Sequence, residues 1–303
     1  MSPHGMATHL DYARPFPYMP SKSISKIRLR LRDGILIGKK AMTRPSVETP
    51  SDNVFHCCLH KSGSQWIRRI LKDARIYKYS GLEAYHYQSS LLDGHDPRPV
   101  NSRRFDEPFP LRKIVTPLYI DYPGYIAIPK PASSRAFFVT RDPRDIVVSW
   151  YFSSKFSHRL MGDLADVRGN LSDLDQVSGL QYSIRHLSSF GLFASQRSWL
   201  DSIGDATTTV IRFEDLIGPE GRDHFIGLFE HCLIEIPDRV LDAVLATYNF
   251  ERLSGRPKGQ EDTHAHFRKG ISGDWRNYFV PEVQNVFDEV VGDLVVQLGY
   301  YLA

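Results

Sequence analysis

Lys61 lies in a short turn whose residue types suit the binding of an anion. Residues 61–64 read Lys-Ser-Gly-Ser, an apolar run precedes them at residues 54–59, and apolar residues recur at helical spacing from Gln65 onward. This pattern predicts a buried strand, a turn and a helix. The first N–H groups of a helix lack intrahelical partners and its dipole adds partial positive charge, so the turn and the Lys61 ammonium suit a phosphate or sulfate group. An ordinary strand-to-helix loop is the alternative for this stretch alone.

The same strand carries His56, Cys58 and His60, which alternate along it and therefore share one face. Histidine and cysteine are residue types that bind zinc. A central strand that leads into a phosphate-binding turn is, however, normally buried on both faces, and cysteine is common in protein cores. We therefore expect a core strand at this place and no metal cofactor.

A second buried strand, at residues 136–140, ends at Arg141. Asp142 is suited to cap a helix and Pro143 to occupy its first position, which predicts a helix from about residue 143 to 155. A guanidinium group makes bidentate contacts with phosphate, so Arg141 is suited to bind an anion, although an intrahelical or surface ion pair is the alternative for this residue alone. The intervening charged residues at positions 144 and 145 are expected to have structural roles.

Three stretches occur in the order found in one enzyme family. They read KSGSQW at residues 61–66, AFFVTRDPRDIVVSWYF at residues 136–152 and FRKGISGDW at residues 267–275. Together they resemble the sulfotransferases that use 3′-phosphoadenosine 5′-phosphosulfate (PAPS). In that family the stretches form the 5′-phosphosulfate loop, the 3′-phosphate strand and helix, and a late loop that closes over the nucleotide. The resemblance extends from about residue 53 to the C-terminus.

The resemblance implies a role for each matching residue. The 5′-phosphosulfate would be bound by Lys61, Ser62, Gly63, Ser64 and Gln65, although relatives commonly have threonine at the last two positions. The 3′-phosphate would be bound by Arg141, Ser149, Arg268, Lys269 and Gly270. The adenine would be contacted by Trp66, by Phe213 in place of a tyrosine, and by Phe250. Lys61 would also stabilise the negative charge that grows on the bridging oxygen as the sulfuryl group leaves.

The catalytic base is the point at which this sequence departs from the family. Many cytosolic members carry a histidine in a T-H-x-P-like run, whereas residues 115–118 here read Val-Thr-Pro-Leu. Glu83 is the predicted replacement, because its 22-residue separation from Lys61 is close to that of the glutamate in tyrosylprotein and heparan-type members. His86 is the alternate base or orienting partner and would share a face with Glu83 if the segment is helical, and Asp121 is a third candidate.

Strands that alternate with helices predict an α/β fold, with a central parallel sheet flanked by helices on both faces and a ligand crevice at the strand carboxyl ends. The resemblance implies the P-loop-containing nucleotide-hydrolase-like version of this fold. Further elements are predicted as a helix from residue 64 to about 74, helices at residues 192–203, 224–232 and 237–247, and a strand at residues 207–213. The Walker A pattern is absent, which argues against a nucleotide kinase.

The composition predicts one domain at residues 51–303 and a basic extension at residues 1–50. The extension suits a hairpin or amphipathic helix that contacts a membrane surface or an acidic partner, or an arm that is packed on the domain or partly disordered. The net charge of +3 argues against a nucleic-acid partner. Three cysteines and the lack of a signal sequence or a membrane-spanning apolar run predict a cytoplasmic location.

Two activities are compatible with these features. The first is the transfer of a sulfuryl group from PAPS to an acceptor hydroxyl by in-line displacement, which leaves adenosine 3′,5′-bisphosphate (PAP). The alternative, motivated by the missing histidine, is a catalytically silent PAPS- or PAP-binding module. The acceptor is left open among a phenol, a sugar and a lipid-linked alcohol, and the loops at residues 85–131 and 153–189 are expected to select it. Residues 276–280 resemble part of the family's dimer motif, which suggests a homodimer, although Asn285 replaces its terminal glutamate.

Overall fold

A computed structural model describes residues 44–91, 94–158 and 164–300. The basic part of the N-terminal extension, and with it the predicted membrane-surface contact, lies outside the described residues. Within the described residues, no helix is both long enough and apolar enough to cross a bilayer.

Five parallel strands form the central sheet, in the order β2-β3-β1-β4-β5. The strands are β1 Asn53–Cys58, β2 Glu83–Tyr85, β3 Lys113–Tyr119, β4 Arg135–Thr140 and β5 Thr208–Arg212. After β1 the chain builds β2 and β3 on one side and then crosses to build β4 and β5 on the other. The strand order therefore reverses between β1 and β4, and a ligand crevice is expected at the carboxyl ends of these two strands. The predicted α/β class with a parallel sheet is confirmed.

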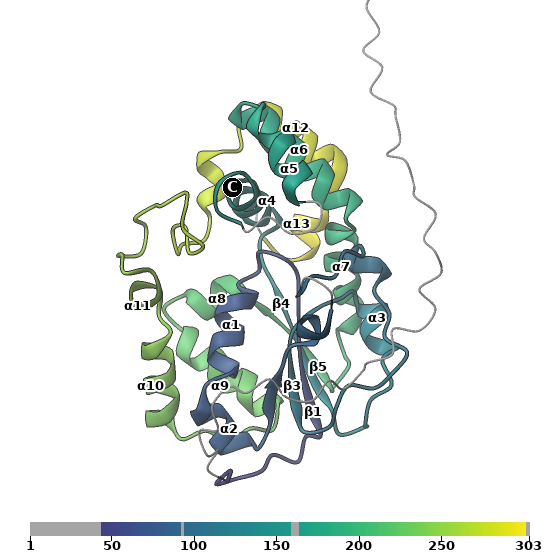
Figure 1. Ribbon diagram of the computed structural model, residues 1–303, viewed down its shortest axis with the longest axis vertical. Helices are drawn as coiled ribbons and strands as arrows, with labels where there is room; N and C mark the ends of the chain where they lie inside the picture. The colour runs from purple at the N-terminus through teal and green to yellow at the C-terminus, as the bar shows by residue number, and fades with distance from the viewer. Residues whose placement is uncertain (1–43, 92–93, 159–163, 301–303) are drawn as a thin grey trace, which may run out of the picture. The chain divides into compact units, whose positions relative to one another are not determined.

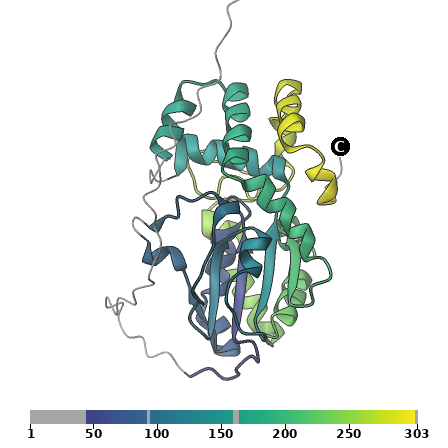
Figure 2. The ribbon, with the colours of Figure 1, turned by 90° about the vertical axis from the view of Figure 1, so that its right-hand side faces the viewer.

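Helices cover both faces of the sheet, and a helical cap lies over the carboxyl ends of the strands (Figures 1 and 2). One face carries α1 Ser64–Leu71, α2 Ala74–Ser80, α8 Phe213–Ile217, α9 Gly221–His231 and α10 Asp238–Thr247. The other face carries α3 Tyr122–Ile126 and α7 Leu192–Ser198. The cap contains α4 Pro143–Phe152, α5 Leu164–Ser172, α6 Gln176–Ser189, α12 Pro281–Val291 and α13 Leu294–Gln297. The short helix α11 Phe250–Ser254 follows α10.

Two hydrophobic cores result from this layering, one on each side of the sheet. Along β1 the side chains alternate between them, with Val54 in one core and Phe55 and Cys57 in the other. Every residue of β1 is buried, as predicted for a central strand. His56 is buried on the side of the core that contains Val54 and Phe137. Its ring stacks on Phe137 at a centroid distance of 5.0 Å, and its Nδ1 lies 2.7 Å from the Thr116 hydroxyl. The described residues contain no group of three His, Cys, Asp or Glu side chains that could hold a metal ion.

The predicted elements differ from the structure mainly at their ends. Asp73 breaks the first predicted helix, because its side chain accepts a hydrogen bond from the Arg75 amide and begins α2. Gly81, with a φ of 67°, then ends α2 in a left-handed conformation that glycine adopts readily. The residues that follow form the edge strand β2, so Glu83 and His86 do not share the helical face that was considered for them.

Candidate active site

The turn after β1 is held in an unusual conformation beside the carboxyl end of β4. Lys61 has a φ of 68°, a left-handed conformation that costs energy for a residue with a Cβ. Its carbonyl accepts a hydrogen bond from Nη1 of Arg141 at 2.9 Å, which ties the two strand ends together. Ser62 supports the turn from below, with its hydroxyl donating to the Leu59 carbonyl at 2.8 Å.

Gly63 allows the turn to approach a neighbouring aromatic ring. Its φ is 81°, and a Cβ at this position would lie only 2.4 Å from a ring atom of Phe213. No other residue type fits both the conformation and the space. The turn leads directly into α1, so the first amides of that helix face the same crevice.

A cavity of about 460 Å³ lies above these strand ends. It brings together twelve of the residues to which the sequence assigned a role: Lys61, Gly63, Ser64, Gln65, Trp66, Arg141, Ser149, Phe213, Phe250, Arg268, Lys269 and Gly270. Ser62 is buried beneath the turn and does not line the cavity, although it shapes the loop. Residues from more than 200 positions apart in the chain therefore meet at one site.

One end of the cavity is suited to a terminal phosphate. Ser149 is the only residue of α4 that is not buried, and it lines the cavity. Arg141 lines the cavity too, and its Nε is buried without a hydrogen-bond partner among the described residues. The late loop adds Arg268 and Lys269, which share the carboxylate of Asp274. These groups offer several positively charged donors to an anion.

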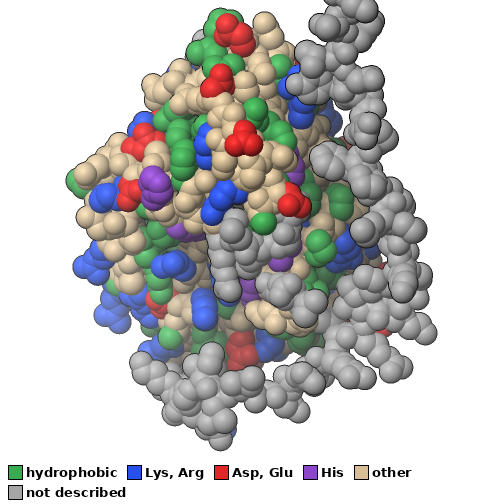
Figure 3. Space-filling view, turned by 45° about the horizontal axis from the view of Figure 1, so that its top comes forward, with side chains coloured by type: hydrophobic (Ala, Val, Ile, Leu, Met, Phe, Trp, Pro, Cys, Tyr) green, Lys and Arg blue, Asp and Glu red, His purple; other side chains and the backbone are tan. Residues whose placement is uncertain are grey.

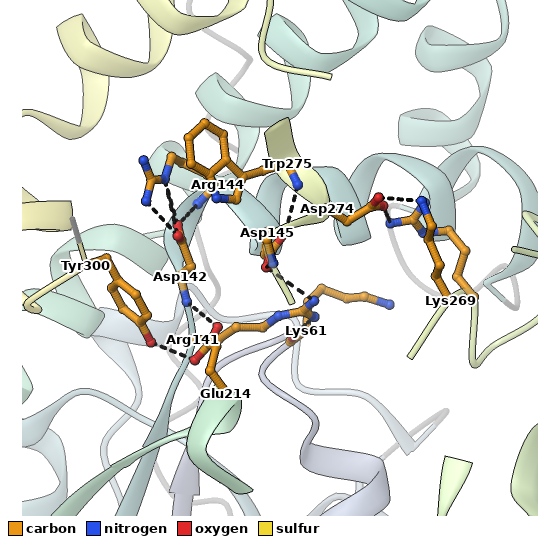
Figure 4. Close-up of polar contacts among 12 residues, drawn as sticks. Lys61, Arg141, Asp142, Arg144, Asp145, Glu214, Lys269, Asp274, Trp275 and Tyr300 are labelled. Atoms are coloured by element: carbon orange, nitrogen blue, oxygen red, sulfur yellow. Dashed lines mark hydrogen bonds and ion pairs between the residues drawn. The ribbon is translucent and has the colours of Figure 1, made fainter. Parts of the chain in front are cut away.

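Asp145 fixes this late loop onto α4 (Figure 4). Its carboxylate accepts hydrogen bonds from the backbone N–H of Gly273 at 2.7 Å and of Trp275 at 3.0 Å. Arg144 packs its guanidinium over the Trp275 ring at 3.7 Å and pairs with Asp142, which caps α4. The structural roles predicted for residues 144 and 145 are confirmed, as is the cap.

Aromatic rings form another part of the cavity wall. Trp66 packs edge-to-face against Phe213, with the ring centroids 6.0 Å apart, and its Nε1 donates to the Tyr248 carbonyl at 2.7 Å. Phe250 packs so closely on Gly270 that a Cβ there would lie 2.4 Å from its ring. Rings held in this way can bind a planar base between them.

Positive charge is concentrated in the cavity. Burial, together with Arg141 and Arg268 nearby, lowers the pKa of Lys61 from 10.5 to about 8. Figure 3 shows Lys and Arg side chains (blue) on the same face of the molecule as several histidines (purple). An anionic ligand in the cavity would offset this repulsion and restore the pKa of the lysine.

Glu83 is not brought to the site. It is paired across the sheet with Lys113, which is itself level with Asn53, the first residue of β1, whereas Lys61 follows the last. The length of β1 therefore separates the two residues, about 17 Å at the rise of a strand. The Glu83 carboxylate instead forms an ion pair with the Lys113 ammonium. As placed, it cannot accept a proton beside Lys61.

The other candidate bases are also engaged elsewhere. His86 lies 3.0 Å from the Ser89 hydroxyl through Nδ1 and 3.3 Å from Gln88 Oε1 through Nε2, and it does not line the cavity. Burial and the nearby Arg68 lower the pKa of His86 to about 4. Asp121 caps α3 by accepting from the Gly124 amide at 2.9 Å.

His60 is a site residue that the sequence reasoning missed. It lines the cavity immediately before Lys61, and its ring stacks on Tyr119 at a centroid distance of 4.3 Å. Its Nε2 is buried and has no hydrogen-bond partner among the described residues. Tyr119, at the end of β3, holds the turn through Ser64 Oγ at 2.9 Å and Gln65 Nε2 at 3.2 Å. The position of His60 next to Lys61 was the signal that could have identified it.

Known proteins of one family are similar in sequence to this chain. A sequence model of the sulfotransferase domain matches residues 128–299, more than half of the chain. A flavonol 4′-sulfotransferase of Flaveria chlorifolia is 23% identical over 290 residues, covering 86% of this chain and 84% of that protein. An amine sulfotransferase of Oryctolagus cuniculus is 21% identical over 266 residues, covering 80% of each chain.

Solved structures show the same fold. Mouse sulfotransferase SULT7A1 complexed with PAP is similar at a TM-score of 0.55 and 18% identity, over 82% of this chain and 86% of that one. Retinol dehydratase in complex with androsterone and the inactive cofactor PAP is similar at a TM-score of 0.51 and 14% identity, over 80% of each chain.

Proposed function

This chain belongs to the sulfotransferase family, and we propose that it transfers a sulfuryl group from PAPS to a hydroxyl group of an acceptor, releasing PAP. The observation that carries the proposal is the single cavity shared by the Lys61 turn, by Arg141 with Ser149, and by residues 268–270. These are the residues that the family resemblance assigns to the two ends of the nucleotide. The structural relatives complexed with PAP support the same donor.

The nucleotide would lie along the cavity with its adenine among the aromatic rings and its phosphates at the cationic groups. In the transfer step, the acceptor oxygen forms a bond to sulfur as the bond from sulfur to the bridging oxygen breaks. Negative charge then develops on the bridging oxygen of the 5′-phosphate, and the Lys61 ammonium stabilises it. The proton of the acceptor hydroxyl must pass to a base within hydrogen-bond reach.

His60 is the base in this proposal. It lines the same cavity as Lys61 and adjoins it in the chain, so a hydroxyl that attacks the sulfuryl group would approach both residues. Its orphaned Nε2 is an additional argument, because a buried nitrogen without a partner costs about 1–3 kcal/mol and such groups are often found at catalytic sites. A hydroxyl that donates to the ring would relieve part of this cost.

The negative charge of the nucleotide would also change the pKa of His60. Burial and the nearby Arg103, with Lys61 among the further causes, hold the pKa of His60 well below its usual value of 6.5, so the ring is neutral and able to accept a proton. An anionic donor beside Lys61 would raise that pKa and strengthen the base. Binding of the donor would thus prepare the site for the acceptor.

The first test is PAP binding measured by isothermal titration calorimetry. We expect saturable binding at micromolar to millimolar concentration, because two clusters of cations and an aromatic wall face one cavity. A folded preparation that binds no PAP at millimolar concentration would contradict the proposed function. Tight PAP binding without transfer of labelled sulfate to any hydroxyl in a broad acceptor panel would instead favour the silent nucleotide-binding module.

Removal of a side chain that binds the 3′-phosphate should weaken the affinity for PAP. Arg268→Ala is expected to weaken PAP binding by about 10- to 100-fold, because a hydrogen bond to a charged group contributes about 1.5–3 kcal/mol. Turnover at saturating PAPS should change much less, because Arg268 is assigned to the phosphate that does not react. Arg239→Ala on α10, which removes an exposed cation outside the cavity, is the matched control. Equal PAP affinity in the two variants would remove Arg268 from the phosphate site.

A further inference from the structure

A groove of about 510 Å³ opens beside the active-site cavity. Its lining includes three cations, namely Arg68 and Arg69 of α1 and Lys72, the residue that follows the helix. Gln65 and His266 line both the groove and the cavity, so the two spaces are continuous at these residues. The groove therefore opens into the cavity beside the turn that begins at Lys61.

The three cations have no carboxylate partner among the described residues. This distinguishes them from Arg75 on α2, which pairs with Asp73, and from Lys269, which pairs with Asp274. No Asp or Glu lines the groove either. The guanidinium of Arg69 lies 5.5 Å from the ring centroid of Phe267, which positions it without neutralising its charge.

The effect of this positive charge is visible on neighbouring groups. Burial, and then Lys61, His158 and Arg69, lower the pKa of His266 to about 4. Burial, offset in part by Tyr119, and the adjacent Arg69 lower the pKa of Arg68 as well. Basic side chains near the end of a helix favour its dipole, but that interaction falls off within one turn and does not require a cluster of three cations facing a groove.

The nucleotide does not account for these cations. Its two phosphate-bearing ends are already matched by the Lys61 turn and by the group around Arg141 and Arg268. An acceptor, by contrast, must approach the sulfuryl group from the side opposite the leaving oxygen. The groove offers space close to the reacting group, because Gln65 and His266 line both the groove and the cavity and His266 lies close enough to Lys61 for the lysine to lower its pKa.

We infer that the acceptor is anionic and that Arg68, Arg69 and Lys72 bind its carboxylate or sulfate groups while its hydroxyl reaches the sulfuryl group. This inference rests on the proposed sulfotransferase function and narrows its substrate class. Arg68 and Lys72 lie one helical turn apart, so anionic groups about 6 Å apart on the acceptor would engage both. Neutral phenols and simple alcohols would leave these cations without partners.

The binding test uses sucrose octasulfate as the anionic probe and sucrose as its neutral counterpart. Each is titrated by calorimetry into protein saturated with PAP, so that the nucleotide cavity is closed to the probe. We expect the octasulfate alone to bind, with an affinity that falls as salt is added. Arg68→Ala/Lys72→Ala should weaken this binding by about tenfold or more, because two charged contacts are lost. PAP affinity should stay the same.

The matched control is Arg185→Ala/Arg239→Ala, which removes two exposed cations from α6 and α10 that do not line the groove. If both double variants weaken octasulfate binding equally, the probe is held by general surface charge and the groove assignment is wrong. Loss of PAP binding in the wild type would instead defeat the proposed function, so the two failures are distinguishable.

A kinetic arm addresses the acceptor itself. Metabolite and oligosaccharide pools are separated by anion exchange and offered with labelled PAPS. We expect acceptor activity in the retained, anionic fraction, with a KM that rises about tenfold or more in Arg68→Ala/Lys72→Ala at little changed kcat. Activity confined to the unretained fraction and equal in wild type and variant would overturn the inference.

Discussion

Lys61→Ala is expected to lower turnover by about 100- to 1,000-fold while weakening PAP binding much less. The reason lies in where charge develops. Before transfer, the phosphosulfate is already held by the backbone of the turn and by the other cations of the cavity. During transfer, the bridging oxygen becomes anionic, and only a positioned positive charge stabilises that change. The interaction is therefore stronger in the transition state than in the bound donor.

The measurement combines single-turnover transfer of labelled sulfate with calorimetry for PAP. Lys61→Arg is the informative companion, because it keeps the charge but alters its geometry, and it should retain part of the activity. Lys269→Ala serves as the contrast, since this lysine is assigned to the 3′-phosphate and should act on affinity. Unchanged turnover in Lys61→Ala would refute the role of the ammonium in the chemical step.

The lowered pKa of Lys61 adds a pH dependence that only this residue should produce. In the free protein its pKa is about 8, and an anionic nucleotide favours the protonated form and raises that pKa. As the pH rises through 8, the free protein loses the Lys61 proton, which favours binding of the anionic nucleotide, so PAP affinity should fall modestly above this pH. Below pH 8 this residue should leave the affinity constant. Lys61→Ala should abolish the decline when PAP affinity is measured from pH 7 to 9.5.

Much of the fold was predictable because the signals are local. The apolar run before Lys61, the cap at Asp142 and the following proline each specify an element from a few neighbouring residues, and the structure contains all of them. The element boundaries were less predictable. Asp73 and Gly81 split and end helices where the apolar spacing alone suggested continuity. The short edge strand β2 exists only because β3 lies beside it.

The nucleotide cavity was largely predictable for a related reason. Ten of the twelve predicted residues that line it occur in three contiguous stretches, Phe213 and Phe250 being the exceptions, and parallel strands bring their carboxyl ends to one edge of the sheet. The separation in sequence did not predict the position of Glu83 correctly, because a residue 22 positions beyond Lys61 can lie at either end of a neighbouring strand. Glu83 is the first residue of β2, and its carboxylate forms an ion pair with Lys113. The groove could not be predicted from the sequence either, because its lining residues come from segments about 200 positions apart, α1 and the loop that contains His266.

His60 was misjudged for a different reason. Its type and its alternation with His56 and Cys58 suggested a core residue, and the ring does pack on Tyr119 and near Trp150. The strand, however, ends two residues earlier, so His60 already belongs to the turn and lines the cavity. Periodicity predicts on which face of a strand a residue lies. It does not show at which residue the strand ends and the side chains begin to line the cavity.

His60→Phe should lower turnover by about 100- to 10,000-fold, the range in which general bases contribute, while leaving PAP affinity nearly intact. Phenylalanine keeps an aromatic ring against Tyr119 and removes only the ring nitrogens. Because Nε2 is buried without a partner, its removal should not destabilise the fold, and the thermal midpoint should be equal or higher. This combination of a stable fold, intact PAP binding and lost turnover would not follow from a purely structural role.

The pH profile provides the second readout. A base acts when it is unprotonated, so a pKa held well below 6.5 in the free enzyme should keep kcat/KM constant from neutral pH down through 6.5. In the complex, the anionic donor raises that pKa, so kcat should begin to fall at a higher pH than kcat/KM. Glu83→Gln is the comparison that decides between the two assignments. Full activity in His60→Phe together with loss of turnover in Glu83→Gln would return the catalytic role to the glutamate, and the opposite pattern would establish that the proton is taken up beside Lys61.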